Sequence, residues 1–390
     1  MLDRLSPPAF KTINTINVLK TTHQKLENGV NFYSLSAGTQ PIIKLEFIFR
    51  AGMFYQPNAL IASTTNALME SGTRSYTANQ LSEGVDFYGS FLELQVEQDF
   101  ATITLFSLNK YLKESLKFVE EVIKSPTFPE SEFKIHITNK RQKHAINSQK
   151  VNILARRKFT ELLFGQEHPY GIDVKDDDFD TITLADVQTF FRNRYNSQNC
   201  TIIASGNLPL DILETLNNSF GAKPWGISEQ IARDESFNKL IRSTSTQKHF
   251  IEKDDAIQSA IRVGRILFNK THPDYFKFQV LNTILGGYFG SRLMANIRED
   301  KGYTYGIGSG LNNLVHAGYF YISTEVGADV TNQTLEEIYK EIKLIRENLI
   351  DDKELETVRN YILGHFLRSV DGPFSLADKF KAIWEFGLDY

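Results

Sequence analysis

Cysteine is nearly absent from this chain of 390 residues, which contains one, Cys200. A single thiol excludes a framework of intramolecular disulfides. Cys200 lies in an apolar run from Asn199 to Ser205 that predicts a buried strand, and no histidine lies near it in the sequence. We therefore expect a buried structural thiol and not a nucleophile.

Long hydrophobic runs are absent as well. No stretch of 18 apolar residues occurs, so the sequence predicts no membrane-spanning helix. Residues 1–8 contain an acidic residue and two prolines where a secretory signal has a basic start and an apolar run. These features predict a cytoplasmic protein without a membrane partner.

Charge of one sign is not in excess. The formal net charge is -4, and the contents of 41% hydrophobic and 23% charged residues are typical of a globular protein. This balance gives no reason to expect nucleic acid as a partner. A chain of this length is expected to form more than one domain.

Histidines with the spacing of metal ligands are also missing. The chain has eight histidines, and His136 and His144 lie near one face of a predicted helix. Eight residues of helix separate them by about 12 Å, which is too far for both to bind one ion. The other histidines have no partner at a ligand-like interval, so histidine spacing predicts no metal site.

The segment from Ala62 to Thr73 has the shape of a metal helix without its ligands. Ser63, Asn66 and Ala67 have the spacing of an inverted His-x-x-Glu-His motif, in which two histidines bind zinc and the glutamate activates a water molecule. Serine and alanine cannot replace imidazoles, and asparagine is not a base. A helix without any special role remains the alternative.

A second informative segment runs from Leu285 to Tyr305. It contains a glycine-rich turn, the sequence Ser291-Arg292-Leu293, then Arg298 and, seven residues later, Tyr305. A guanidinium and a phenol can both donate hydrogen bonds to a substrate carbonyl or oxyanion. The turn matches neither a phosphate-binding loop nor a dinucleotide-binding motif. The alternative is structural: Arg298 ends a helix and Tyr305 packs in a strand.

These two segments resemble the pitrilysin/insulinase-like peptidases of family M16 (M16B type), and the resemblance spans essentially the whole chain. In that family the inverted zinc motif is followed by Gly-Thr, as at Gly72-Thr73, and a further carboxylate completes the zinc site from a later helix. That carboxylate is expected near Lys143 to Asn147. No Asp or Glu occurs between Glu132 and Glu161, so the resemblance implies that both halves of the zinc site are lost.

The order of predicted elements repeats along the chain. Strands, two helices, paired strands and a covering helix occur before residue 220 and again after residue 248. Capping boxes at Thr77 and Thr183 start two of the helices, and one long helix is expected from Pro129 to about Gly165. The predicted fold is α+β, a tandem of two homologous αβ sandwich domains with antiparallel-rich sheets covered by helices, as the family resemblance also implies.

The predicted boundaries are 1–220 for a first domain with the degenerate zinc motif, 221–247 for a linker, and 248–390 for a second domain with Arg298 and Tyr305. The second half lacks the last helix and strand of the first half, so a truncated C-terminal domain is an expectation. The segment from Lys134 to Lys158 has eight cations and no carboxylate. It is expected to face a chamber or a partner, or else to be a solvated face.

Some M16 enzymes have two subunits, of which one keeps the zinc motif and its homologue keeps the Arg/Tyr pair. The resemblance therefore implies a subunit that is inactive alone. It would bind peptide and supply Arg298 and Tyr305 to a zinc-bearing partner in a heterodimer, and it would need no cofactor of its own. The alternative is a non-proteolytic scaffold or peptide-binding protein.

Overall fold

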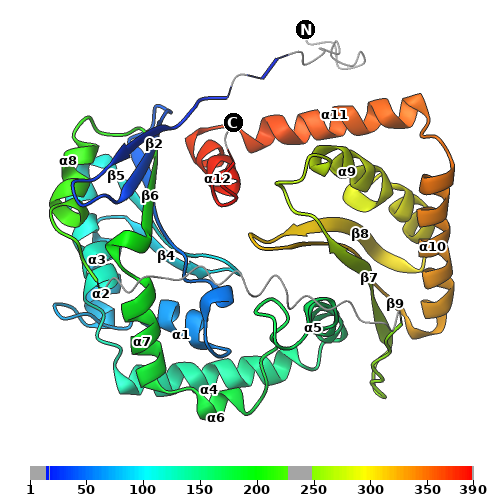
Figure 1. Cartoon of the computed structure of the whole chain (residues 1–390), viewed down its shortest axis with the longest axis horizontal. Helices are drawn as coiled ribbons and strands as arrows, with labels where there is room; N and C mark the ends of the chain where they lie inside the picture. Colours follow the sequence, from blue (N-terminus) through cyan, green and yellow to red (C-terminus); the bar gives the residue numbers. More distant parts are fainter. Residues whose placement is uncertain (1–14, 17, 227–247, 389–390) are drawn as a thin grey trace, which may run out of the picture.

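The computed structural model describes residues 15–16, 18–226 and 248–388, which form two β-sheets and the helices packed on them. In Figure 1 the six-stranded sheet lies on the left and the three-stranded sheet on the right. Helix α4 runs along the bottom of that view and α11 along the top. The structure describes residues 221–226 of the predicted linker 221–247, and residues 227–247 lie outside the described residues.

The first sheet has the order β1-β2-β6-β3-β5-β4 and is antiparallel except between β2 and β6. The paired strands expected in the first half are β4 and β5, which are antiparallel neighbours. Cys200 is buried at the start of β6, as expected. The strand bounds are Thr22–Lys25, Asn31–Ser36, Ile42–Phe49, Phe91–Val96, Ala101–Leu108 and Cys200–Gly206 for β1 to β6.

Alternation along β3 decides which face of this sheet holds the larger core. Ile43, Leu45, Phe47 and Phe49 are buried in one cluster with residues of five helices. The amphipathic α3 contributes much of that cover, because its apolar side chains repeat at helical spacing. The helices are α1 (Ile61–Leu68), α2 (Ala78–Phe87), α3 (Leu112–Lys124), α7 (Leu184–Arg194) and α8 (Ile212–Leu216).

The second sheet has the order β7-β9-β8 and is antiparallel throughout. Its strands are β7 (Gln258–Leu267), β8 (Thr304–Asn313) and β9 (Gly318–Gly327). The helices of this half are α9 (Tyr275–Asn282), the π-helical segments η6 (Thr283–Gly287) and η7 (Met294–Asp300), α10 (Thr331–Glu347), α11 (Asp352–Ser369) and α12 (Pro373–Trp384).

Each sheet receives a helix from the other half of the chain. Helix α12 packs on β2 and β6, where Phe380 is buried with Ile48 and Ile203 of the first sheet. Helix α5 (Val151–Phe164) packs on β7 of the second sheet. Figure 1 shows both helices beside the sheet of the opposite half.

Most local predictions hold, and one is wrong. Thr77 and Thr183 form the predicted capping boxes with Gln80 and Asp186. The single long helix after Pro129 is instead two helices, α4 (Glu130–Asn147) and α5, and the short α6 (Asp178–Thr181) follows. The chain turns at residues 148–150, and α5 then packs on β7 of the second sheet.

The fold is α+β and antiparallel-rich, as predicted. Within the predicted linker, Trp225 packs against the first core, and its Nε1–H donates to the Phe220 carbonyl. No helix of the described residues is both long and apolar enough to cross a membrane.

Candidate functional site

The degenerate zinc motif lies on α1, with two of its three positions facing outward. Ser63 and Ala67 are one turn apart and partly exposed, on the side where α1 contacts α4. Asn66 is only 3% exposed, and its Nδ2 donates to the Tyr195 hydroxyl at 3.3 Å. The residue at the position of the general base is therefore a buried link between α1 and the end of α7.

A lysine occupies the space across from Ser63. The Lys140 Nζ donates to the Ser63 Oγ at 2.5 Å, and the Ser63 hydroxyl donates to the Leu60 carbonyl at 3.2 Å. Burial and then the charge of Lys143 lower the pKa of Lys140 to about 8. The family resemblance implies a zinc-site carboxylate near residues 143–147. In the structure, the residue of α4 that contacts Ser63 is Lys140.

This group of side chains does not fit zinc. The face of α1 offers a hydroxyl and a methyl group, and an ammonium already lies against the hydroxyl. Within the described part of the chain, no three His, Cys, Asp or Glu side chains are placed to hold a metal ion. Burial and then Lys140 lower the pKa of the nearby His136 to about 4, so that ring stays neutral at ordinary pH.

Four of the eight cations between Lys134 and Lys158 have a carboxylate partner, whereas Lys140 still feels the like charge of Lys143. Arg141 pairs with Asp180 at 2.5 Å, and Arg157 pairs with Asp173. These carboxylates come from the segment after α5, which folds back along α4 (Figure 1). The sequence could not show this, because the partners lie beyond the helix that carries the cations.

Tyr305, one of the Arg298/Tyr305 pair, lies at a β-bulge at the beginning of β8. Thr304 faces Val326 on β9, while Ile307 faces Thr324, so β8 has one extra residue between the two pairings. The Thr304 hydroxyl donates to the Glu325 carbonyl at 2.7 Å, which fixes the start of the bulge. Tyr305 lies inside the bulge and is 95% exposed.

The preceding segment η7 is fixed to two helices by polar side chains. Arg292 forms a two-point ion pair with Glu354 of α11, with N–O distances of 2.8 and 2.6 Å. The Asn296 Nδ2 donates to Glu337 and Glu341 of α10 at 2.8 and 2.7 Å. These contacts hold the backbone that carries Arg298.

Glycine in the turn before η7 has a packing reason. A Cβ at Gly286 would lie 2.8 Å from the Ser309 backbone nitrogen, so only glycine lets the turn approach β8 this closely. Asn282 is also buried there and accepts from the Ser309 hydroxyl at 2.8 Å. The glycine-rich segment is therefore a support for η7.

Arg298 itself is partly exposed. Its guanidinium carbon lies 4.5 Å from the centre of the Phe289 ring, and Phe289 is 63% exposed. The side chains of Arg298 and Tyr305 thus belong to the surface and not to the apolar core of the second half. The structural alternative for Tyr305, packing within a strand, is not what the bulge produces.

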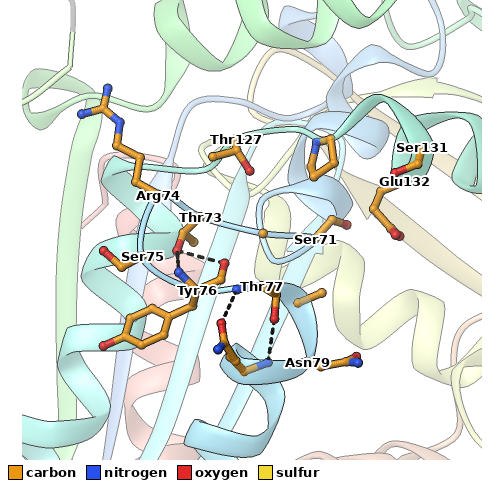
Figure 2. Close-up of a pocket in the computed structure, with 14 residues that line it drawn as sticks. Ser71, Thr73, Arg74, Ser75, Tyr76, Thr77, Asn79, Thr127, Ser131 and Glu132 are labelled. Carbon is orange, nitrogen blue, oxygen red and sulfur yellow. Dashed lines mark hydrogen bonds between the residues drawn. The ribbon is translucent and has the colours of Figure 1, made fainter.

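The hollow in Figure 2 lies at the other end of α1, between the starts of α2 and α4. Gly72 and Thr73 line it and form a turn, in which the Tyr76 N–H donates to the Thr73 hydroxyl at 3.1 Å. Gly72 has φ +146°, which glycine tolerates best. The Gly-Thr pair after the motif is therefore part of a turn whose polar atoms bond one another.

Residues 181–362 match the family described as "Peptidase M16 inactive domain". The Helicobacter pylori protein "Non-peptidase homolog YmxG" is 22% identical over 76% of this chain and 68% of its own length. The Bacillus subtilis "Uncharacterized zinc protease YmxG" is 21% identical over 78% of this chain and 73% of its own length.

A solved structure of the peptidase M16 inactive domain from Pseudomonas fluorescens has the same fold. It superposes with a TM-score of 0.83 at 23% identity, over 95% of this chain and 89% of that chain. These comparisons agree with the resemblance to family M16: residues 181–362 match its inactive domain, and the relatives and the fold are similar to those of M16 proteins. The chain is thus similar to the M16 inactive domain and to a relative described as a non-peptidase homologue.

Proposed function

We propose that this protein is the non-metal subunit of a heterodimeric M16 peptidase. It binds peptide substrates and supplies Arg298 and Tyr305 to a zinc-bearing homologous subunit. The observation that carries the proposal is the contrast between the two halves. The first half has lost every zinc ligand, while the second half keeps an exposed Arg/Tyr pair on a rigid support.

Rigidity supports a binding role for the pair. Stabilising a developing oxyanion requires donors that are already in place, because reorganisation during the reaction would cost free energy. The ion pair of Arg292 with Glu354 and the bulge at Thr304 hold the two backbone positions. A guanidinium and a phenol on such supports can bind a peptide carbonyl beside a metal that another subunit holds.

The test is peptide hydrolysis by a complex of this chain with a zinc-bearing M16 homologue from the same genome. Arg298→Ala or Tyr305→Phe should lower turnover of a quenched fluorescent peptide by about 10²-fold, the effect of losing one oxyanion donor. Complex formation and Tm should be unchanged, because both side chains are at the surface.

Matched controls use an arginine and a tyrosine of α10 that are also exposed, in the variants Arg346→Ala and Tyr339→Phe. These variants should leave turnover unchanged. If the Arg298 and Tyr305 variants behave like the controls, the scaffold or peptide-binding alternative becomes the better description. The cytoplasmic location stays a prediction that cell fractionation tests.

A further inference from the structure

We propose that Ser63 and Lys140 form a serine–lysine pair in which Ser63 is a nucleophile toward carboxylic esters and Lys140 is its general base. This proposal does not rest on the proposed function, because it requires neither zinc nor a partner subunit. It assigns an activity to the place where the zinc ligands are missing.

Geometry is the first argument. The Lys140 Nζ lies 2.5 Å from the Ser63 Oγ, within the reach that a base needs to take the hydroxyl proton. The two side chains come from α1 and α4, which pack against each other, so the contact is fixed by two helices and not by a loop. Both side chains are partly exposed.

The state of the lysine is the second argument. A lysine acts as a base only when it is neutral, and most lysines are charged at neutral pH. Burial, followed by the charge of Lys143, lowers the pKa of Lys140 to about 8. His136, another titratable group near this ammonium, has its own pKa lowered and is neutral at ordinary pH, so it neither raises nor lowers the pKa of Lys140 through charge.

The start of α1 is the third argument. Leu60, directly before the helix, has φ 73°, a left-handed conformation that is strained for a non-glycine residue. Its carbonyl accepts from the Ser63 hydroxyl, so this backbone holds the nucleophile in place. Ser63 is the third residue of α1, where the helix dipole favours the negative charge of an oxyanion.

A short acyl group is the substrate we propose for this pair. Ala67 follows Ser63 by one turn on the same partly exposed face, so the side chain one turn from the hydroxyl is a single methyl group. Asn66 points the other way, into the first core, where it contacts Tyr195. An acetyl or similar acyl chain can lie over Ala67 once it is bonded to Ser63.

The reaction needs no other reagent than water. The Ser63 Oγ bonds to the ester carbonyl carbon, its proton passes to the neutral Lys140 Nζ, and the carbon–oxygen bond to the alcohol breaks. The alcohol leaves with the proton from Nζ. Water then attacks the acyl-serine, gives a proton to Nζ, and the acid leaves as Ser63 regains its proton.

The experiment measures labelling of Ser63 in the whole purified chain with a fluorophosphonate probe, and the burst of p-nitrophenol from p-nitrophenyl acetate, both with a chelator present. Peptide mapping should place the adduct on Ser63. The rate should fall at least about 10²-fold in Lys140→Met, the scale of a lost general base. Ser63→Ala should give no adduct in this segment.

Lys140→Arg separates catalysis from structure. Arginine keeps a cation that can donate to Ser63 but cannot be deprotonated in a protein, so labelling should be lost while Tm is kept. Ser82→Ala on α2 and Lys134→Met on α4 are controls, since both side chains are exposed and neither touches the pair. Both controls should label at the rate of the wild type.

The pH profile is the final readout. Labelling should rise with pH to a plateau with a midpoint near 8, the pKa of Lys140. Lys143→Gln removes the charge that helps to lower this pKa and should move the midpoint to higher pH. Labelling on another residue, or an unchanged rate in Lys140→Met and Lys140→Arg, would overturn the proposal and leave the Arg298/Tyr305 function untouched.

Discussion

At the scale of single residues, the segment that resembles a zinc motif forms a contact between a half-buried cation and a hydroxyl. Lys140 bonds to Ser63, at the position where the family resemblance predicts a histidine. The replacement keeps a positive charge in the place of a metal but offers no ligand. The cost of burying that charge appears as the lowered pKa of Lys140.

Replacing Lys140 by methionine should therefore raise the stability of the fold at pH 7. The pKa of Lys140 is about 8 in the folded chain against a reference value of 10.5. Because the unfolded chain binds more protons between these values, wild-type stability gains as pH rises from about 8 to 10.5. The Lys140→Met variant lacks this pH-dependent gain, so the difference in stability between the variant and the wild type should become smaller as pH rises from about 8 to 10.5.

Measuring the Tm of both proteins from pH 6 to 10.5 checks this expectation. Each kcal/mol of difference in unfolding free energy should shift Tm by roughly 2–4 °C. Lys134→Met is the control, since that lysine is exposed and its loss should change Tm little. A lower Tm for Lys140→Met at pH 7 would mean that the hydrogen bond to Ser63 outweighs the cost of burial.

At the scale of elements, the docking of α12 on the first sheet depends on a small network of ions. Lys44 and Glu46 of β3 are buried and lie 3.1 Å apart. Asp378 of α12 pairs with Lys44 at 2.6 Å, and Lys381 of α12 pairs with Glu46 at 3.4 Å. Each buried charge thus has a partner on the opposite element, which burial requires.

Glu46→Ala should destabilise the protein by about 3 kcal/mol, because it leaves the buried Lys44 and Lys381 with one carboxylate between them. Urea unfolding measures the loss. Hydrogen exchange should become faster in α12 and β6, which face each other across this network. Glu93→Ala on β4 is the control, because that carboxylate accepts from the Gln95 Nε2–H at 2.7 Å in an exposed contact and forms no ion pair among the described residues, so the change should alter neither measurement.

At the scale of the whole molecule, the two halves meet at a polar junction beside α12. Asp99, in the turn between β4 and β5, accepts from the Tyr170 hydroxyl and from the Val315 N–H at 3.0 Å in the turn between β8 and β9. Glu385, just after α12, lines the same junction. Burial, helped by Glu97 and opposed by Lys381, raises the pKa of Glu385 to about 7.

This junction predicts a loss of stability as pH rises toward neutrality. The folded pKa of Glu385 lies above its reference value of 4.5, so its contribution is complete below about pH 4.5 and is lost as pH rises to about 7. Glu385→Gln should remove this dependence and give a higher Tm than the wild type at pH 8. Equal pH profiles for the two proteins would contradict the assignment.

Metal content is a second property of the whole chain. We expect elemental analysis of the purified protein to find no stoichiometric zinc, because Ser63, Asn66 and Ala67 supply no ligand and the Lys140 ammonium, which has the same sign of charge as a metal ion, bonds to Ser63. One tightly bound zinc per chain, lost when residues 63–67 are changed, would contradict this prediction.

The sequence by itself determined what depends on neighbouring residues. The capping boxes at Thr77 and Thr183 fixed the starts of α2 and α7, and the apolar run around Cys200 predicted a buried strand. These inferences succeed because helix capping and strand patterns depend on residues that are close together in the sequence.

Tertiary structure alone decided what covers each face. Lys44 and Glu46 on the charged face of β3 are covered by α12, whose Asp378 lies 334 residues from Lys44 along the chain. The contact of Lys140 with Ser63 also joins residues that are 77 positions apart. A period shows which side of an element is apolar or polar, but the partner of that side is set by the packing of the whole chain.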